Sequence, residues 1–288
     1  MTAHIMHGIT YIISTADVAS MNIGNRLIEQ AHLPVKDEAE GYTYYSGSVC
    51  SAVAIPGIHI HAERLDGEIA RLFGLRPDIL VFLSTHRSES GSPAVTLHPV
   101  GNFGEARLGG TSRLLVPSPA AYMAGRLMGL KEAFRDTKYA VTFEATHHGP
   151  FVEMPAMFAE IGSDQAAWED REAARRLAAT LLNGTDADGR VAVGVGGGHY
   201  CPRFTDLALK KQLNFSHFVP NHQLGAVDED VADEIVRKSG GATVAVVHRS
   251  RNFAAEADRV CSLLEERGMA ITDGSDAPLR NNGSRIRT

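Results

Sequence analysis

Stretches of β-forming apolar residues alternate with stretches of helical periodicity from one end of the chain to the other. The run at 79–84, ILVFLS, is continuously apolar until its last residue, which is typical of a strand covered on both faces of a sheet. Further strands are predicted at 9–14, 48–55, 58–60, 94–97, 139–143, 191–195, 215–219 and 243–247. Helices are predicted at 18–31, 62–74, 117–134, 163–183, 205–213, 228–239 and 254–267. This alternation predicts an α/β fold with a mostly parallel or mixed central sheet flanked by helices.

The length and composition fit one such domain. With no linker or repeat between the elements, we expect a single domain over residues 1–288, with a loosely ordered polar tail at 273–288. A net charge of −6 argues against a broad basic surface for DNA, and leaves room for a local basic patch. Three scattered cysteines without a C-x-x-C pair, no signal-peptide core and no membrane-length apolar run predict a cytoplasmic protein.

The first candidate site follows the strand at 139–143. Glu144, His147 and His148 come at the end of this strand, before a turn at Gly149-Pro150. Side chains of these types supply metal ligands or a general base. The alternative is a turn in which the histidines make ordinary hydrogen bonds.

A second candidate site follows the strand at 79–84. His86 and Glu89 are three residues apart, a spacing that lets both side chains of one tight loop reach a single metal ion. Zinc takes imidazole nitrogen and carboxylate oxygen at such sites and keeps one position open for water. His98 comes soon afterwards, at the end of the next short strand.

The glycine-rich run at 194–198 matches neither the dinucleotide-binding fingerprint nor the P-loop. Its exposed backbone amides suit a carboxylate, a phosphate or a developing oxyanion, and the alternative is close packing of backbone in a tight turn. His199 and Cys201 follow at once, but no Cys-His spacing marks Cys201 as a nucleophile.

Two other polar positions carry simpler interpretations. Asp17 is predicted to cap the helix at 18–31 rather than to face a site. His59 and His61 alternate with isoleucines, so we expect both on the solvent face of a strand.

Four predicted strands end in loops that bear histidine, near His86, His147, His199 and His222. In a parallel sheet these ends meet at one edge, so a clustered site is the economical explanation. Metal-assisted hydrolysis is the reaction class that it best supports.

Four long motifs carry a family resemblance: residues 84–91 (STHRSESG), 97–103 (LHPVGNF), 143–150 (FEATHHGP) and 194–205 (GVGGGHYCPRFT). They resemble the D-aminoacyl-tRNA deacylases of the archaeal and plant type, and the resemblance runs from the first strand to the last helix. It implies a cytoplasmic, zinc-dependent hydrolase that cleaves the ester of D-aminoacyl-tRNA and releases a D-amino acid and tRNA. It also implies a fold akin to the phosphorylase/hydrolase class.

Within this resemblance we assign roles by inference. The metal ligands are expected to be His86, Glu89 and one further histidine, for which we select His148 over His147 and His199. Glu144, His147 and His199 are the expected catalytic residues, with Glu144 as general base. Substrate contacts are expected from His98, from Arg87 and from the oxyanion-binding amides of Gly196, Gly197 and Gly198.

The expected partner is the acceptor end of D-aminoacyl-tRNA, bound by a monomer with no role for DNA or membrane. Candidate tRNA contacts are the basic residues Arg87, Arg171, Arg175, Arg176, Arg203, Lys210 and Lys211, although a solvated helix face explains any one of them. Two rivals stay open. One is a metal-dependent amidohydrolase or carboxypeptidase acting on a small acyl-amino acid, and the other is a non-catalytic tRNA-binding protein.

Overall fold

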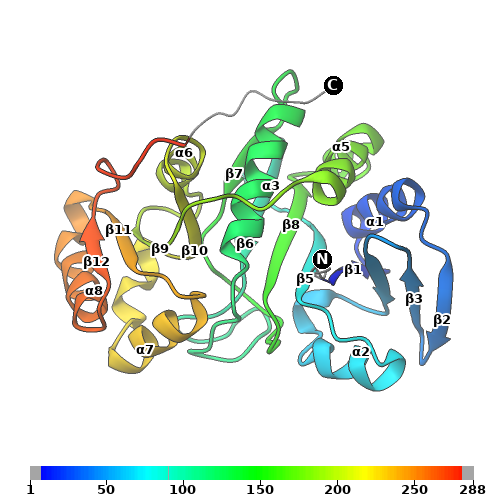
Figure 1. Cartoon of the computed structure of the whole chain (residues 1–288), viewed down its shortest axis with the longest axis horizontal. Coiled ribbons are helices and arrows are strands. Elements are labelled where there is room, and N and C mark those ends of the chain that lie inside the picture. The colour runs from blue at the N-terminus through cyan, green and yellow to red at the C-terminus, as the bar shows by residue number, and fades with distance from the viewer. Residues whose placement is uncertain (1–7, 90, 281–288) are drawn as a thin grey trace, which may run out of the picture.

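Two β-sheets organise the chain in this computed structural model, which describes residues 8–89 and 91–280. The larger sheet has eight strands in the order β2-β3-β4-β1-β5-β8-β6-β7, and the smaller has four in the order β10-β9-β11-β12. The smaller sheet and its helices lie on the left in Figure 1, and β1 to β3 lie on the right. The α/β class and the mixed central sheet are confirmed, and the second sheet was not predicted.

The strands of the large sheet are β1 (Ile9–Ser14), β2 (Val35–Ala39), β3 (Tyr42–Ser46), β4 (Ser51–Ile55), β5 (Ile79–Thr85), β6 (Ala94–Pro99), β7 (Ala140–Phe143) and β8 (Ala156–Gly162). Those of the small sheet are β9 (Arg190–Gly196), β10 (Leu213–Val219), β11 (Val244–His248) and β12 (Ala270–Thr272). The helices are α1 (Val18–Ala31), α2 (Leu65–Phe73), α3 (Ala120–Ala133), α4 (Gln165–Trp168), α5 (Arg171–Asn183), α6 (Pro202–Lys210), α7 (Glu229–Lys238) and α8 (Ala254–Glu266). Three 3₁₀ turns complete the set: η1 (His59–His61), η2 (Asn221–Ala226) and η3 (Arg251–Phe253).

Strand direction changes within the large sheet. Strands β4, β1, β5 and β8 are parallel to one another. Strand β6 is antiparallel to β8, and β7 is parallel to β6. The carboxyl ends of β5 and β7 therefore lie at opposite edges, so the prediction that the site loops share one edge of a parallel sheet is wrong.

Helices cover the sheets with their buried apolar residues. Helices α1, α3 and α5 contribute Leu27, Leu127 and Leu177 to a core that also contains Val81 of β5. Helix α2 covers part of the opposite face, where Leu65 packs among residues such as Phe82 and Phe158. Helices α7 and α8 pack with the small sheet in a separate apolar cluster. None of the helices within 8–89 and 91–280 is long and apolar enough to cross a bilayer.

Several predicted elements need correction. The expected strand at 58–60 is the turn η1, and His59 is buried with Nε2 2.9 Å from the carbonyl oxygen of Leu83, so it does not face solvent. The single helix expected at 163–183 is two helices, because Asp170 caps α5 by accepting the amides of Glu172 and Ala173. Asp17 caps α1 as predicted, by accepting the amide of Ser20 at 2.8 Å.

Three strand regions were not predicted: the edge hairpin β2–β3, the last strand β12 and, most relevant to function, β8. The loosely ordered tail was expected over 273–288, and the structure describes its first part, up to residue 280. Over 273–280 it is held by Arg280, which donates to the carbonyl oxygens of Ala208 and Lys211 at 3.0 and 3.1 Å. Residues 281–288 lie outside the described part of the chain.

Candidate active site

A cluster of histidines and glutamates lies on one face of the large sheet, where β8, β6 and β7 adjoin. The register pairs Glu160 of β8 with Thr96 of β6, and Phe158 with His98. Because side chains alternate along a strand, Glu160, Phe158, Thr96 and His98 share this face. The ring of His98 stacks on Phe158, with centroids 5.0 Å apart.

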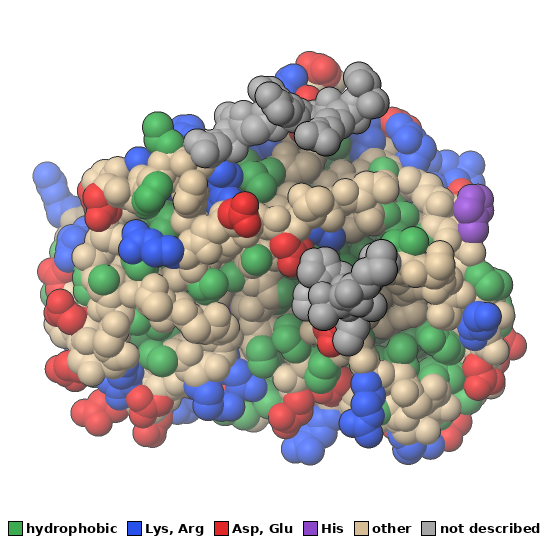
Figure 2. Space-filling view, in the orientation of Figure 1, with side chains coloured by type: hydrophobic (Ala, Val, Ile, Leu, Met, Phe, Trp, Pro, Cys, Tyr) green, Lys and Arg blue, Asp and Glu red, His purple; other side chains and the backbone are tan. Residues whose placement is uncertain are grey.

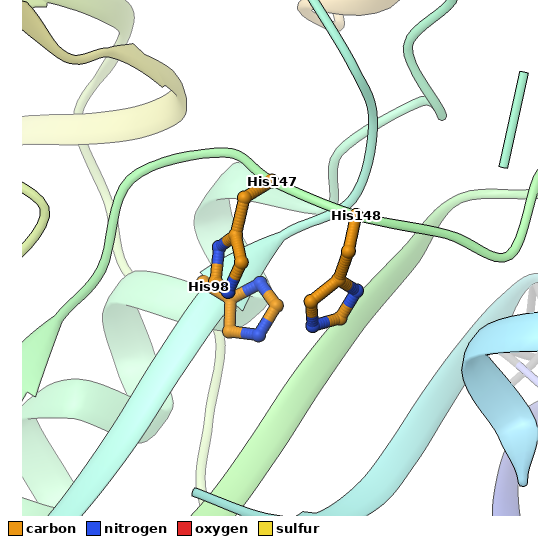
Figure 3. A group of neighbouring side chains, drawn as sticks. All are labelled: His98, His147 and His148. Atoms are coloured by element: carbon orange, nitrogen blue, oxygen red, sulfur yellow. The ribbon is translucent and has the colours of Figure 1, made fainter. Parts of the chain in front are cut away.

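Three histidines of this cluster face one another. His98 ends β6, and His147 and His148 follow β7; Figure 3 shows their rings gathered below the loop that carries His147 and His148. A ring nitrogen of each lies within 4.8 Å of the others, close enough to hold one metal ion. The sequence analysis had separated these residues into a substrate contact, a catalytic residue and a metal ligand.

Backbone carbonyls orient all three rings. Nδ1 of His98 is 3.0 Å from the carbonyl oxygen of Pro99, and Nδ1 of His147 is 2.7 Å from that of Ala145. Nδ1 of His148 is 2.7 Å from the carbonyl oxygen of Gly149. A carbonyl accepts only, so each Nδ1 donates. In the neutral ring Nε2 then keeps its lone pair, which is the usual arrangement of a metal-ligating histidine.

The charge state of these rings suits a ligand role. Burial, with the nearby His98 ring adding to it, holds the pKa of His147 well below its ordinary range and lowers that of His148 to about 3. Both are therefore neutral at pH 7. Burial also acts to lower the pKa of His98, but the Glu160 carboxylate outweighs it and raises that pKa.

Two buried carboxylates bind the cluster together. Glu160 Oε1 lies 3.5 Å from His98 Nε2, and its Oε2 lies 3.5 Å from His86 Nδ1. Glu144 Oε1 lies 2.9 Å from the same His86 nitrogen. His86, Glu144 and Glu160 form a second group whose possible ligand atoms lie within 4.8 Å of one another. Burial opposes ionisation of Glu144, but His199 and His86 outweigh it and hold its pKa below the ordinary value.

His86 is held as a cation in this arrangement. Burial acts to lower its pKa, whereas the hydrogen bonds and charges of Glu144 and Glu160 raise it to about 11. One imidazolium between two carboxylates leaves one negative charge in excess, which favours a further cation in the cluster.

His199 comes from the small sheet, where it follows strand β9. The segment after β9 pairs with the end of β7, where Ala145 donates its amide to the carbonyl oxygen of His199 at 2.8 Å. This places His199 Nε2 3.3 Å from Glu144 Oε2, while 44% of the side chain stays exposed. The neighbouring Tyr200 hydroxyl lies 2.8 Å from His86 Nε2. Glu144 thus joins the residues of both sheets.

A cleft of about 660 Å³ opens over the cluster. Its polar floor contains His86, Glu144, Glu160, His147, His148 and His199, and its wall includes Arg87 and Trp168. This volume is within the range usual for small-molecule sites. Beyond His147 and His148 lies another hollow, about 470 Å³, formed with Glu105, Leu108, His222 and Gln223.

Glu89 is the predicted ligand that the structure places elsewhere. It is exposed and belongs to none of the three candidate ligand groups found in the described chain. The carboxylates beside His86 are instead Glu144 and Glu160, and the sequence analysis missed Glu160. One signal was available: the buried run at 156–162, AMFAEIG, contains a single charged residue.

The glycine run has a packing role. A Cβ on Gly196, whose φ is +91°, would lie 2.3 Å from the carbonyl oxygen of His248 on the neighbouring strand. The amide of Gly197 donates to Asn221 Oδ1 at 3.1 Å. Neither these two glycines nor Gly198 lines the cleft, which places the predicted oxyanion amides away from the cluster. Among the predicted substrate contacts, His98 is also fully buried, and only Arg87 reaches the cleft.

Cys201 is not arranged as a nucleophile. Its side chain is buried, and burial together with the Glu144 charge raises the pKa of its thiol well above the ordinary value. It is therefore a neutral thiol at pH 7, and a thiol attacks far more slowly than a thiolate.

Most of the basic residues proposed to contact tRNA have other partners. Arg175 and Arg176 pair with Glu172, and Lys210 pairs with Asp206, all within their own helices. Lys211 and Arg203 donate to backbone carbonyls of residues 273–277. On the face drawn in Figure 2, acidic and basic side chains are interspersed.

Comparison with known proteins gives a consistent result. Residues 73–272 match the family model described as D-aminoacyl-tRNA deacylase. The chain is 35% identical over 277 residues to a D-aminoacyl-tRNA deacylase of Methanosarcina mazei, with 93% of each chain covered. It is 36% identical over 212 residues to one of Thermococcus onnurineus, covering 72% of this chain and 78% of that protein. The crystal structure of a conserved protein of unknown function superposes with a TM-score of 0.87 at 26% identity, covering 95% and 98% of the two chains.

Proposed function

The chain belongs to the D-aminoacyl-tRNA deacylase family, a family of ester hydrolases, and from this premise we propose that it hydrolyses the ester bond of D-aminoacyl-tRNA with the help of a bound zinc ion. The products are a free D-amino acid and tRNA. The observation that carries the metal part of the proposal is the His98, His147 and His148 group, whose three Nδ1 atoms are occupied by backbone carbonyls.

This donor set fits zinc. Three neutral imidazoles with an open fourth position are a common set of protein ligands in catalytic zinc sites. Nε2 of His98 is a buried nitrogen without a hydrogen-bond partner in the described chain, although Glu160 is 3.5 Å away. When bound, the ion lowers the pKa of water and polarises the ester carbonyl. The carboxylate of Glu160 adds negative charge beside the group.

His199 is the residue that we assign to proton transfer. Its Nε2 lies 3.3 Å from Glu144 Oε2, and its half-exposed ring borders the cleft. The carboxylate orients the ring, so that the other ring nitrogen takes a proton from the attacking water and returns it to the departing ribose oxygen. Glu144 itself is too weak a base for this step because of its low pKa, so it acts by positioning His86 and His199.

The ester needs little further activation, because an aminoacyl ester is an activated acyl group. The imidazolium of His86 with the Tyr200 hydroxyl, 2.8 Å from its Nε2, adds hydrogen-bonding capacity next to the carboxylates. His86 is buried and Tyr200 is half-buried. We place the reaction in the cytoplasm, in keeping with three buried cysteines that are all free.

The test is hydrolysis after removal and return of the ion. We expect chelation to abolish release of amino acid from D-aminoacyl-tRNA, and stoichiometric zinc to restore it. The variant His148→Gln should lose both zinc and activity. His61→Gln is the matched control, because His61 is exposed and lies in none of the candidate ligand groups. Full activity of chelated protein, or of a zinc-free His148→Gln variant, would remove the metal from the mechanism.

A further inference from the structure

One wall of the cleft carries two stacked planar groups. The guanidinium carbon of Arg87 lies 4.9 Å from the centroid of the Trp168 ring, and both residues line the cleft that holds the histidine cluster. Trp168 ends the short helix α4, which Asp164 caps through the amide of Ala167. Arg87 directly follows His86 in the chain. The Arg87–Trp168 pair is therefore one residue removed from the reactive cluster.

The indole also fixes its own position relative to that cluster. Trp168 Nε1 donates to the carbonyl oxygen of His86 at 3.0 Å. A ligand bound to the Arg87–Trp168 pair therefore has a fixed position relative to the residues of the histidine cluster. A tight coupling between binding surface and reacting groups is what an ester substrate needs, because small errors in position are costly to catalysis.

The charge of Arg87 is available to a ligand. Its side chain is exposed, and its one recorded contact among residues 8–89 and 91–280 is with the Trp168 ring. By contrast, Arg175 and Arg176 of α5 both pair with Glu172. In a protein of net charge −6, an arginine left unpaired beside an aromatic ring at a cleft wall is suited to a flat, electron-rich ligand.

Exposed apolar side chains also border the cleft. Among the described residues, Val18, Ile58 and Leu108 are three of the six large hydrophobic side chains that are exposed, and all three line this cleft. A purely phosphate-binding site would be rimmed by donors instead. The combination of an apolar rim with a π-stacked cation favours a nucleobase over a phosphate group.

We propose that the Arg87–Trp168 pair is the stacking platform for the terminal nucleobase of the tRNA, a role that rests on the proposed function. The base lies against the guanidinium and indole faces, and its ribose ester then extends over the floor of His147, His148 and His199. Stacking reads no base-specific pattern, so this platform serves every tRNA with the same end.

The chain offers a direct readout, because Trp168 is its one tryptophan. The probe is the trinucleotide cytidylyl-cytidylyl-adenosine, titrated against the full-length protein while tryptophan fluorescence is recorded. We expect saturable quenching that survives zinc removal, and none with the same trinucleotide lacking its terminal base. Absence of quenching by the intact trinucleotide, or equal quenching by the abasic one, overturns the proposal.

Variants separate the platform from general effects on the fold. Arg87→Ala keeps the fluorophore and should raise the Kd of the trinucleotide about tenfold, from the low part of the range for one base stack. Trp168→Phe keeps an aromatic face but loses the hydrogen bond to His86, and should raise KM less than Trp168→Ala. Arg175→Ala is the matched control, since Arg175 is paired with Glu172 away from the cleft, and its Kd should be unchanged.

The two proposals fail in different ways. If the protein has no deacylase activity but quenching depends on the terminal base, the platform stands and the proposed reaction does not. If D-aminoacyl-tRNA is hydrolysed with the same KM whether Arg87 is arginine or alanine, the reaction stands and the platform is refuted.

Discussion

Replacing Glu160 by glutamine should change how many protons zinc displaces. The carboxylate lies 3.5 Å from ring nitrogens of both His86 and His98. At an effective dielectric constant of about 20, one such pair interacts with about 5 kcal/mol. That attraction is what outweighs burial and raises the pKa of His98. In Glu160→Gln the strongest of these opposing interactions is lost, so the pKa of His98 should fall.

The consequence is a difference in stoichiometry. His147 and His148 are already neutral at pH 7, whereas the Glu160 carboxylate raises the pKa of His98, so that a proton competes more strongly with a metal for its Nε2. Zinc binding to the wild-type protein should therefore release more protons than zinc binding to Glu160→Gln. For the same reason, zinc affinity should depend more steeply on pH in the wild type than in the variant.

Isothermal titration calorimetry in two buffers of different ionisation enthalpy measures this proton count. Glutamine keeps the shape of the side chain. Its amide oxygen can still accept the hydrogen bond that the Thr96 hydroxyl donates to Glu160 Oε2 at 3.4 Å. Glu132→Gln is the control, because Glu132 is exposed at the end of α3 and pairs with Arg135. Equal proton release from wild type and Glu160→Gln would refute the assignment of His98 as a ligand that competes with a proton.

Three further predictions concern single residues. His199→Gln should lower kcat by roughly 10²- to 10⁴-fold, as for loss of a general base, while the zinc content measured by atomic absorption stays at the wild-type value; loss of zinc would make His199 a ligand instead. Cys201→Ala should keep most of the deacylase activity, and a complete loss in a folded variant would restore the nucleophile hypothesis. Burial lowers the pKa of His217 to about 4 from an ordinary 6.5, so its contribution to stability is complete above pH 6.5 and is lost as the pH falls toward 4. The loss is about 3 kcal/mol, and urea unfolding of His217→Gln should show a correspondingly shallower pH dependence; an unchanged slope would contradict this.

The sequence located most of the site but not its geometry. Histidines after predicted strands pointed to His86, His147, His148 and His199, which the structure brings together in one cluster. The antiparallel step between β8 and β6 was not visible, since strand direction depends on long-range pairing. As a result, the residues meet over a face of the sheet rather than at its edge.

Glu160 shows the second limit. A strand buried on both faces has apolar residues at nearly every position. The single charged residue within 156–162 therefore creates no alternating pattern from which its orientation could be predicted. Glu89 was selected in its place because three-residue spacing favours local pairs. In the structure His86 lies beside Glu144 and also beside Glu160, which comes from a strand more than seventy residues later, through a contact that no local pattern encodes.

The glycine run shows a third limit. Bare amides after a strand suit an oxyanion, but they suit close packing equally well, and only the neighbouring strand decides between the two. The carbonyl oxygen of His248 leaves no room for a side chain at Gly196. Trp168 was likewise overlooked, because a predicted helix from 163 to 183 hid the break that brings the indole to the cleft.

The central claim is metal-assisted hydrolysis of the D-aminoacyl ester, and the most direct measurement compares D-tyrosyl-tRNA with L-tyrosyl-tRNA. Release of tyrosine would be followed with native protein, after chelation, and after return of zinc. The account predicts rapid loss of the D ester alone, abolished by the chelator and restored by zinc. Turnover of the D ester that is unaffected by chelation, or tRNA binding without turnover of either ester, would contradict it.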